Sequence, residues 1–111
     1  MIHEMRLHDK PFQLIKRGTK TIELRLNDEK RKLIKTGDKM YFTNRSTGEI
    51  IMTQVIGLHI YNNFIELYKN FDKLSLEYDS GEEGNSKDME IYYSKEEQEK
   101  YGVLGIEIKL L

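Results

Sequence analysis

The stretch that decides the fold covers residues 18–26 and reads Gly18-Thr19-Lys20-Thr21-Ile22-Glu23-Leu24-Arg25-Leu26. Its apolar residues fall at every second position, at Ile22, Leu24 and Leu26, with polar residues between them. Strict alternation is typical of a β-strand with one buried face, because successive side chains point to opposite sides of a strand. The sequence therefore predicts a strand over residues 20–26 that follows a turn at Gly18 and carries one polar face.

The polar face of this strand holds residue types that bind charged ligands. Glu23 and Arg25 are two positions apart, so they project from the same side, about 7 Å apart along the strand. Lys20 lies at the start of the strand beside Gly18, and Thr21 shares the polar face. Arginine and lysine bind phosphate, and a carboxylate accepts from a base amino group, so this face predicts a nucleotide site. Acid–base chemistry at Lys20 and an ordinary ion pair on a solvated strand are the alternatives.

Apolar patterns and turn residues predict the elements on both sides of this strand. Before it, we expect a short strand over residues 3–7 and a helix that Asp9 caps and Gly18 ends. After it, we expect strands over residues 40–43, 49–60 and 103–111, and short helices within residues 63–71, 85–93 and 94–102. The last strand must pair with an early one to bury its apolar residues. This order predicts an α+β fold, a small β-barrel with short helices packed around it.

Three local signals predict how these elements begin and bend. Ser94 and Glu97 have the spacing of a capping box, which starts a helix. Asn63 and Glu66 have the same spacing, with asparagine in the place of serine. Gly57 lies inside a long apolar run and predicts a bulge or bend in that strand.

Composition excludes several classes of function. The 111 residues predict one domain over residues 1–111, and a net charge of −1 argues against bulk electrostatic coating of nucleic acid. The chain has no cysteine, and its three histidines lack metal-ligand spacing, so we expect no metal site, disulfide or cofactor. Apolar runs are only a few residues long, and the N-terminus lacks the pattern of a signal peptide. We therefore expect a cytoplasmic monomer or small homo-oligomer with no membrane partner.

Charge is distributed unevenly along the chain. Residues 16–39 hold nine Lys and Arg against four Asp and Glu, a net of +5, and residues 72–99 hold three against ten, a net of −7. Two solvated faces that partly neutralise each other would explain this pattern. A basic patch for an anionic ligand, such as a nucleic-acid backbone, is the functional interpretation. Arg31 belongs to that patch as a candidate phosphate contact, and Tyr61 is a candidate stacking face for a base.

The stretch beginning at Gly18 resembles a known family. Gly18-x-Lys20-x-x-Glu23-x-Arg25 matches the G-x-K-x-x-E-x-R signature of the ASCH domains, which belong to the PUA-like superfamily. The resemblance extends over nearly the whole chain, through residues 28–38, 61–64, 99–103 and 106–108. It implies a small mixed β-barrel surrounded by short helices, with a polar cleft lined by Lys20, Glu23 and Arg25. It also implies an RNA-binding or nucleotide-binding module.

The same resemblance implies a second function. Some small bacterial ASCH proteins are similar in this stretch and remove the acetyl group from N4-acetylcytidine, and others are ribonucleases. The amidohydrolases have a catalytic threonine where this chain has Glu23, and a carboxylate cannot replace a hydroxyl nucleophile directly. If this protein is such an enzyme, Lys20 would be the base, Glu23 the acid or a ligand acceptor, and Glu66 the further acidic partner. A third interpretation is a protein-interaction module that keeps only the scaffold.

Overall fold

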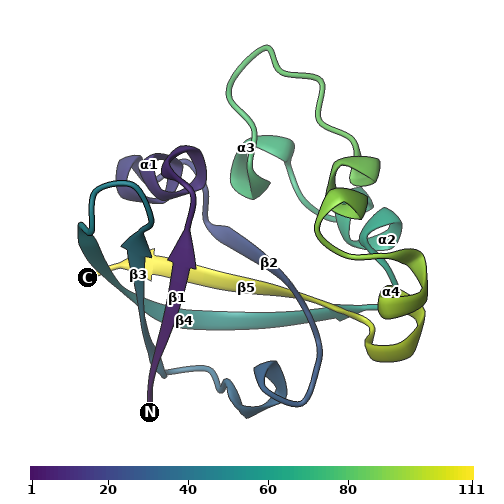
Figure 1. Cartoon of the computed structure of the whole chain (residues 1–111), viewed down its shortest axis with the longest axis horizontal. Helices are drawn as coiled ribbons and strands as arrows, with labels where there is room; N and C mark the ends of the chain where they lie inside the picture. The colour runs from purple at the N-terminus through teal and green to yellow at the C-terminus, as the bar shows by residue number, and fades with distance from the viewer.

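The computed structural model describes residues 1–111 and contains one five-stranded sheet (Figure 1). The strands are β1 (Ile2–Leu7), β2 (Ile22–Leu26), β3 (Lys39–Asn44), β4 (Ile50–Tyr61) and β5 (Val103–Leu110). Their order across the sheet is β1-β3-β4-β5-β2, with β1 parallel to β3 and the other pairs antiparallel. The sheet curls into a half-barrel, which confirms the α+β prediction.

Short helices occupy the connections of the sheet. They are α1 (Asp9–Arg17), α2 (Phe64–Lys69), α3 (Lys73–Leu76), α4 (Lys95–Tyr101) and the 3₁₀ helices η1 (Arg31–Leu33) and η2 (Ser86–Ile91). Figure 1 shows α2 and α4 grouped where β4 ends and β5 begins, α3 near β2, and α1 beside β1. None of the helices is long and apolar enough to span a membrane.

Strand β2 forms because its alternation matches the pleat of the sheet. It pairs with β5 from Ile22 opposite Glu107 to Leu26 opposite Val103. This pairing confirms that the last strand returns to an early one. The strand is shorter than predicted, because Lys20 and Thr21 lie before it, where the backbone of Lys20 still bonds to the end of α1 at Leu14.

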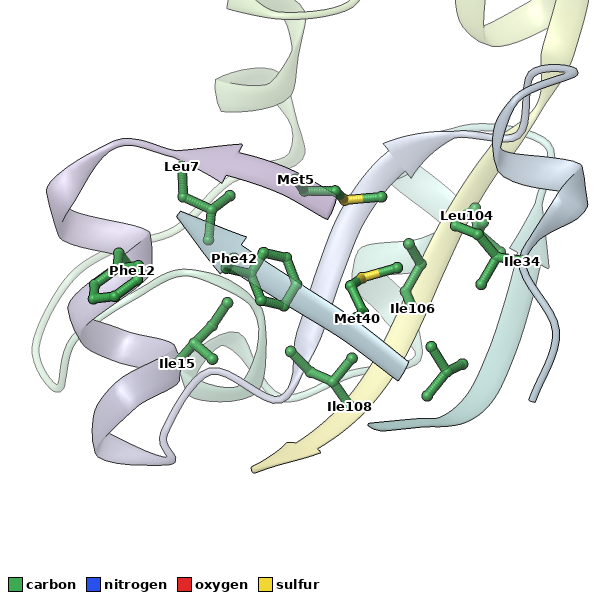
Figure 2. Packing of buried hydrophobic residues seen from close by; sticks show 11 residues of the cluster. Met5, Leu7, Phe12, Ile15, Ile34, Met40, Phe42, Leu104, Ile106 and Ile108 are labelled. Atoms are coloured by element: carbon green, nitrogen blue, oxygen red, sulfur yellow. The ribbon is translucent and has the colours of Figure 1, made fainter. Parts of the chain in front are cut away.

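Two apolar clusters hold the fold together. One fills the concave side of the sheet, where α1 packs Phe12 and Ile15 over Phe42 of β3 (Figure 2). The other lies between β2 and the helices that follow β4, and includes Leu24, Phe64 and Leu67 among others. The apolar residues of β2 are thus buried in this second cluster. Glu23 and Arg25, on the polar face of the strand, belong to the candidate site.

The local signals are mostly confirmed. Gly18 ends α1 with a φ of 86°, and Ser94 with Glu97 forms the full capping box of α4. The sheet register shifts between Val55 and Gly57, where the bulge was expected. Asn63 caps α2 by accepting a hydrogen bond from the backbone of Glu66.

One helix prediction needs correction. His8, not Asp9, is the N-cap of α1, and the Asp9 carboxylate instead accepts hydrogen bonds from Asn44 (2.9 Å) and Gln13 (3.2 Å). A tertiary partner on β3 thus replaces the local cap. The short helix expected within residues 85–93 is confirmed as the 3₁₀ helix η2, which Asn85 caps.

Candidate functional site

Lys20 forms a buried cationic centre behind the polar face of β2. Its side chain is 0% exposed, and its Nζ donates to the carbonyl oxygens of Ile22 (2.6 Å) and Leu76. The same Nζ lies 3.3 Å from Oε1 of Glu23. An ammonium group has three donors, and these three contacts use all of them. Lys20 therefore ties the start of β2 to the end of α3 and lies against the Glu23 carboxylate.

Glu23 and Arg25 form an ion pair, which is one of the alternatives that the sequence leaves open for this strand face. Oε2 of Glu23 accepts from Nε of Arg25 at 3.0 Å and from Nη2 at 2.8 Å. Burial raises the pKa of the Glu23 carboxyl, but the charges of Lys20 and Arg25 outweigh burial and hold that pKa below its ordinary value. Glu23 is therefore ionised at neutral pH and held between two cations.

A pocket of about 120 Å³ opens onto this ion pair, between the two edge strands β1 and β2. Polar and aromatic side chains make up most of its lining: Arg6, His8, Glu23, Arg25, Arg45, Glu77, Tyr92 and Tyr93. Leu7, Pro11, Leu24 and Met89 complete the wall. Arg6 and His8 come from β1 and the residue that follows it, while the tyrosines follow η2. The pocket therefore exists only because the curled sheet brings its edges together.

Glu77, directly after α3, is the unexpected acidic group of the pocket. Its carboxylate has no hydrogen bond or salt bridge within the protein. Burial raises the pKa of the Glu77 carboxyl, the charge of Lys20 opposes this shift, and the negative charge of Glu23 adds to it. Glu66, the acidic residue expected near the site, is instead exposed on α2 and pairs with Lys69 at 3.3 Å. The sequence held no signal for Glu77, which is one of ten acidic residues within residues 72–99.

Two of the predicted ligand residues lie away from this pocket. Thr21 lines a separate hollow beside β5, and its backbone bonds to Ser75 and Ile108. Tyr61 lies at the end of β4 and packs edge-on against Phe71, with ring centroids 6.2 Å apart. The structure thus brings Glu23 and Arg25 together over Lys20, and it separates Thr21 and Tyr61 from them.

Arg31 lies beside the pocket, in a groove that we name the arginine groove. Arg6, Arg25, Lys30, Arg31 and Arg45 line it together with Glu4 and Met5. Its volume is about 460 Å³. Arg6, Arg25 and Arg45 line both the pocket and the groove, so the two hollows adjoin. Arg6 and Arg45 were not singled out from the sequence, because each lies far along the chain from the strand that carries Arg25.

The acidic segment over residues 72–99 closes one side of this region. Asp79 pairs with Arg17 at 2.7 Å and Glu82 pairs with Lys10 at 2.8 Å, both across to α1. The segment also supplies Glu77 and the two tyrosines of the pocket. The two oppositely charged segments therefore meet at the site. The structure gathers no group of three His, Asp or Glu side chains that could hold a metal ion.

Comparison with known proteins places the chain among small domains of this fold. The sequence model of the ASCH domain family matches residues 5–111. The crystal structure of the hypothetical protein PH0355 is 34% identical, with a TM-score of 0.86 and 100% of both chains covered. The solution structure of protein PF0455 from Pyrococcus furiosus is 33% identical, with a TM-score of 0.77, over 100% of this chain and 98% of that one.

An ASCH domain from Lactobacillus crispatus shares the fold at lower identity. It is 16% identical, with a TM-score of 0.61, over 98% of this chain and 79% of that chain. The comparison with curated proteins gives no match.

Proposed function

Since this chain belongs to the ASCH domain family, we propose that it binds RNA or a nucleotide in the pocket between β1 and β2. The observation that carries this proposal is the pocket itself. It joins the Glu23–Arg25 pair to two tyrosines and to arginines that have no acidic partner. Fixed polar groups beside aromatic faces are what recognition of an unstacked base requires.

Different residues of the pocket would contact different parts of the bound base. Tyr92 and Tyr93 offer ring faces on which a base stacks, and Tyr92 is 54% exposed. Glu77 has both carboxyl oxygens free for the polar edge of that base, while Arg25 and Lys20 keep Glu23 in place. Because these polar groups are already oriented, a base would meet a preformed site.

An amide-resolved NMR titration with a short RNA hairpin at low salt tests this proposal. We expect shifts concentrated around residues 23–25, 77 and 92–93. Tyr92→Ala should weaken binding about fivefold or more, because base–aromatic stacking contributes about 1–3 kcal/mol per base. Ile91→Ala is the matched control, since Ile91 is 82% exposed and does not line the pocket.

Two results would contradict the binding proposal. One is the absence of localised shifts with the hairpin and with single nucleotides. The other is a set of shifts spread over exposed lysines, with equal affinities for Tyr92→Ala and Ile91→Ala. Either result would favour the third interpretation, in which the domain binds another protein.

Hydrolysis of a modified nucleoside is a second candidate function, which the position of Glu77 favours. Nζ of Lys20 is enclosed by two carbonyl oxygens and Glu23, and Glu23 is held between two cations. Glu77 has no hydrogen-bond or salt-bridge partner in the pocket, and burial raises the pKa of its carboxyl above the ordinary value. A carboxyl group with a raised pKa is suited to general acid–base work. If the pocket hydrolyses an amide, Glu77 is the group that moves the proton.

Incubation of the protein with N4-acetylcytidine, followed by chromatography of the product cytidine, tests the second candidate. Glu77→Gln should lower turnover by about a hundredfold or more, the size expected for loss of a general acid–base group. Glu66→Gln removes an exposed carboxylate outside the pocket and should retain full turnover. Absence of turnover by the unmodified protein at high enzyme concentration would rule out this activity.

A further inference from the structure

We infer that the ligand of this pocket carries a phosphate group and that the phosphate binds in the adjoining arginine groove. This inference rests on the proposed function, in which the pocket takes a base. It adds a second subsite and an orientation: the base enters between β1 and β2, and the phosphate lies toward η1. The phosphate could belong to a free nucleotide or to an RNA chain, and the chemistry of recognition is the same for both.

The size of the pocket is the first argument for a second subsite. Pockets that bind small ligands usually have volumes of about 300–1,000 Å³. The pocket between the edge strands has only about 120 Å³, so it holds one part of a ligand and leaves the rest outside. The arginine groove has about 460 Å³ and shares three arginines with the pocket. A ligand that extends beyond the pocket on this side enters the groove.

The charges of the groove are the second argument. Five cationic side chains line it against a single carboxylate, that of Glu4, which accepts a hydrogen bond from Tyr41. Arg6, Arg45 and Lys30 form no salt bridge in the protein. Like charges in a concave surface repel one another and raise the local concentration of anions. The groove therefore favours an anionic ligand that supplies the missing counter-charge.

Arg31 adds a donor that the protein itself does not use. Its Nη1 pairs with Asp28 at 3.0 Å, but its Nε is buried and has no hydrogen-bond partner. A buried donor without a partner is uncommon in folded proteins and calls for an explanation. Arg31 lines the groove with its side chain 22% exposed, and the planar guanidinium group of an arginine matches the geometry of phosphate oxygens.

The backbone holds the groove arginines in a fixed arrangement. Arg6 lies on the outer face of β1, since its neighbours Met5 and Leu7 are buried in the core. Arg45 follows β3, and its backbone N–H donates to the carbonyl oxygen of Leu7 at 2.8 Å. The parallel pairing of β1 with β3 thus sets these two arginines side by side. Arg25 stands at the junction, because it lines both hollows.

Paired titrations with ribonucleosides and their 5′-monophosphates test the phosphate subsite by NMR. We expect each monophosphate to bind about tenfold or more tightly than its nucleoside, with additional shifts at residues 6, 31 and 45. The double variant Lys30→Gln/Arg31→Gln changes two residues that line the groove but not the pocket. It should bring the monophosphate affinity down toward that of the nucleoside and leave the nucleoside affinity unchanged. The matched control is Lys35→Gln/Lys109→Gln, which removes two exposed charges outside the pocket and groove.

The outcomes separate this inference from the proposed function. Equal affinity for nucleosides and monophosphates would overturn the phosphate subsite and leave the base pocket in place. Equal weakening by the control variant would also overturn it, since charge alone would then explain the preference. Absence of pocket shifts with every probe would overturn both proposals together.

A single-stranded RNA identifies the source of the phosphate. If the RNA binds more tightly than the monophosphate, the phosphate belongs to a chain, and equal affinity indicates a free nucleotide. For RNA, each cationic side chain removed from the groove should reduce the slope of log K against log salt by about 0.7. An unchanged slope in the double variant would show that the groove does not bind the backbone.

Discussion

At Lys20, the protein buries a cation without leaving any of its donors unpaired. Its Nζ donates to carbonyl oxygens at the end of α3 and at the start of β2. It also lies beside Oε1 of Glu23, whereas Arg25 bonds to Oε2 of the same carboxylate. The spacing of Glu23 and Arg25 predicted that they share one strand face, but not whether they pair with each other or with a ligand. The burial of Lys20 could not be predicted, since it depends on α3, which lies more than fifty residues along the chain. Glu77 could not be predicted as part of the site for the same reason, because it lies more than fifty residues after Glu23 and Arg25 in the chain.

Lys20→Met should destabilise the fold strongly. The substitution leaves the Glu23 carboxylate with one cation instead of two and removes the partner of two carbonyl oxygens. Removal of one partner from a buried ion pair costs about 3–5 kcal/mol. Urea unfolding, followed by circular dichroism, measures the free energy of unfolding. Lys109→Met on the exposed end of β5 is the control and should stay within about 0.5 kcal/mol of the unmodified protein. Equal stability of the two variants would contradict a structural role for Lys20.

Among the helices and strands, the sequence predicted best the features that depend on residues close together in the chain. The alternation of β2, the glycine that ends α1 and the capping box of α4 are all local signals, and all three are confirmed. Predictions were wrong where a distant residue competes for the same group, as Asn44 does for the carboxylate of Asp9. The short helix expected within residues 85–93 is the 3₁₀ helix η2, which begins at a capping box of Asn85 and Asp88.

At the scale of the whole molecule, the site is a product of how the sheet closes. The alternation within each strand predicted a barrel and the return of the last strand, but not which strands would form its edges. The parallel pairing of β1 with β3 requires a crossover through α1, β2 and η1, and no residue within β1 signals it. Because β1 and β2 are the edges, the pocket and the arginine groove lie between residues that are distant in sequence. The sequence therefore predicted that Glu23 and Arg25 lie on one face of β2 and missed most of the residues that form the wall of the site.

A contact between β1 and the turn before β3 makes the free energy of unfolding depend on pH in the acidic range. Asp38, in the turn before β3, bonds to His3 of β1 at 2.8 Å and to the backbone N–H of Lys35 at 3.0 Å. These contacts lower the pKa of the Asp38 carboxyl from its ordinary value of 3.8 to about 2, and the hydrogen bond with His3 has the largest effect. Between these two values the unfolded chain binds the proton and the folded protein does not. The contribution of Asp38 to stability is therefore complete above about pH 4 and is lost as the pH falls toward 2.

Asp38→Asn should accordingly lower the free energy of unfolding at neutral pH, and its difference from the unmodified protein should shrink as the pH falls from about 4 to about 2. The asparagine keeps the size of the side chain and removes its charge, so the variant isolates the titration. Urea unfolding at a series of pH values measures both proteins. Glu29→Gln is the matched control, because the Glu29 side chain is 89% exposed and its only salt bridge is a long one to Lys32, so its curve should follow that of the unmodified protein. A difference between Asp38→Asn and the unmodified protein that stays constant over this range would show that Asp38 acts by packing. A shrinking difference would establish that the contact between β1 and the turn before β3 depends on the charge of Asp38.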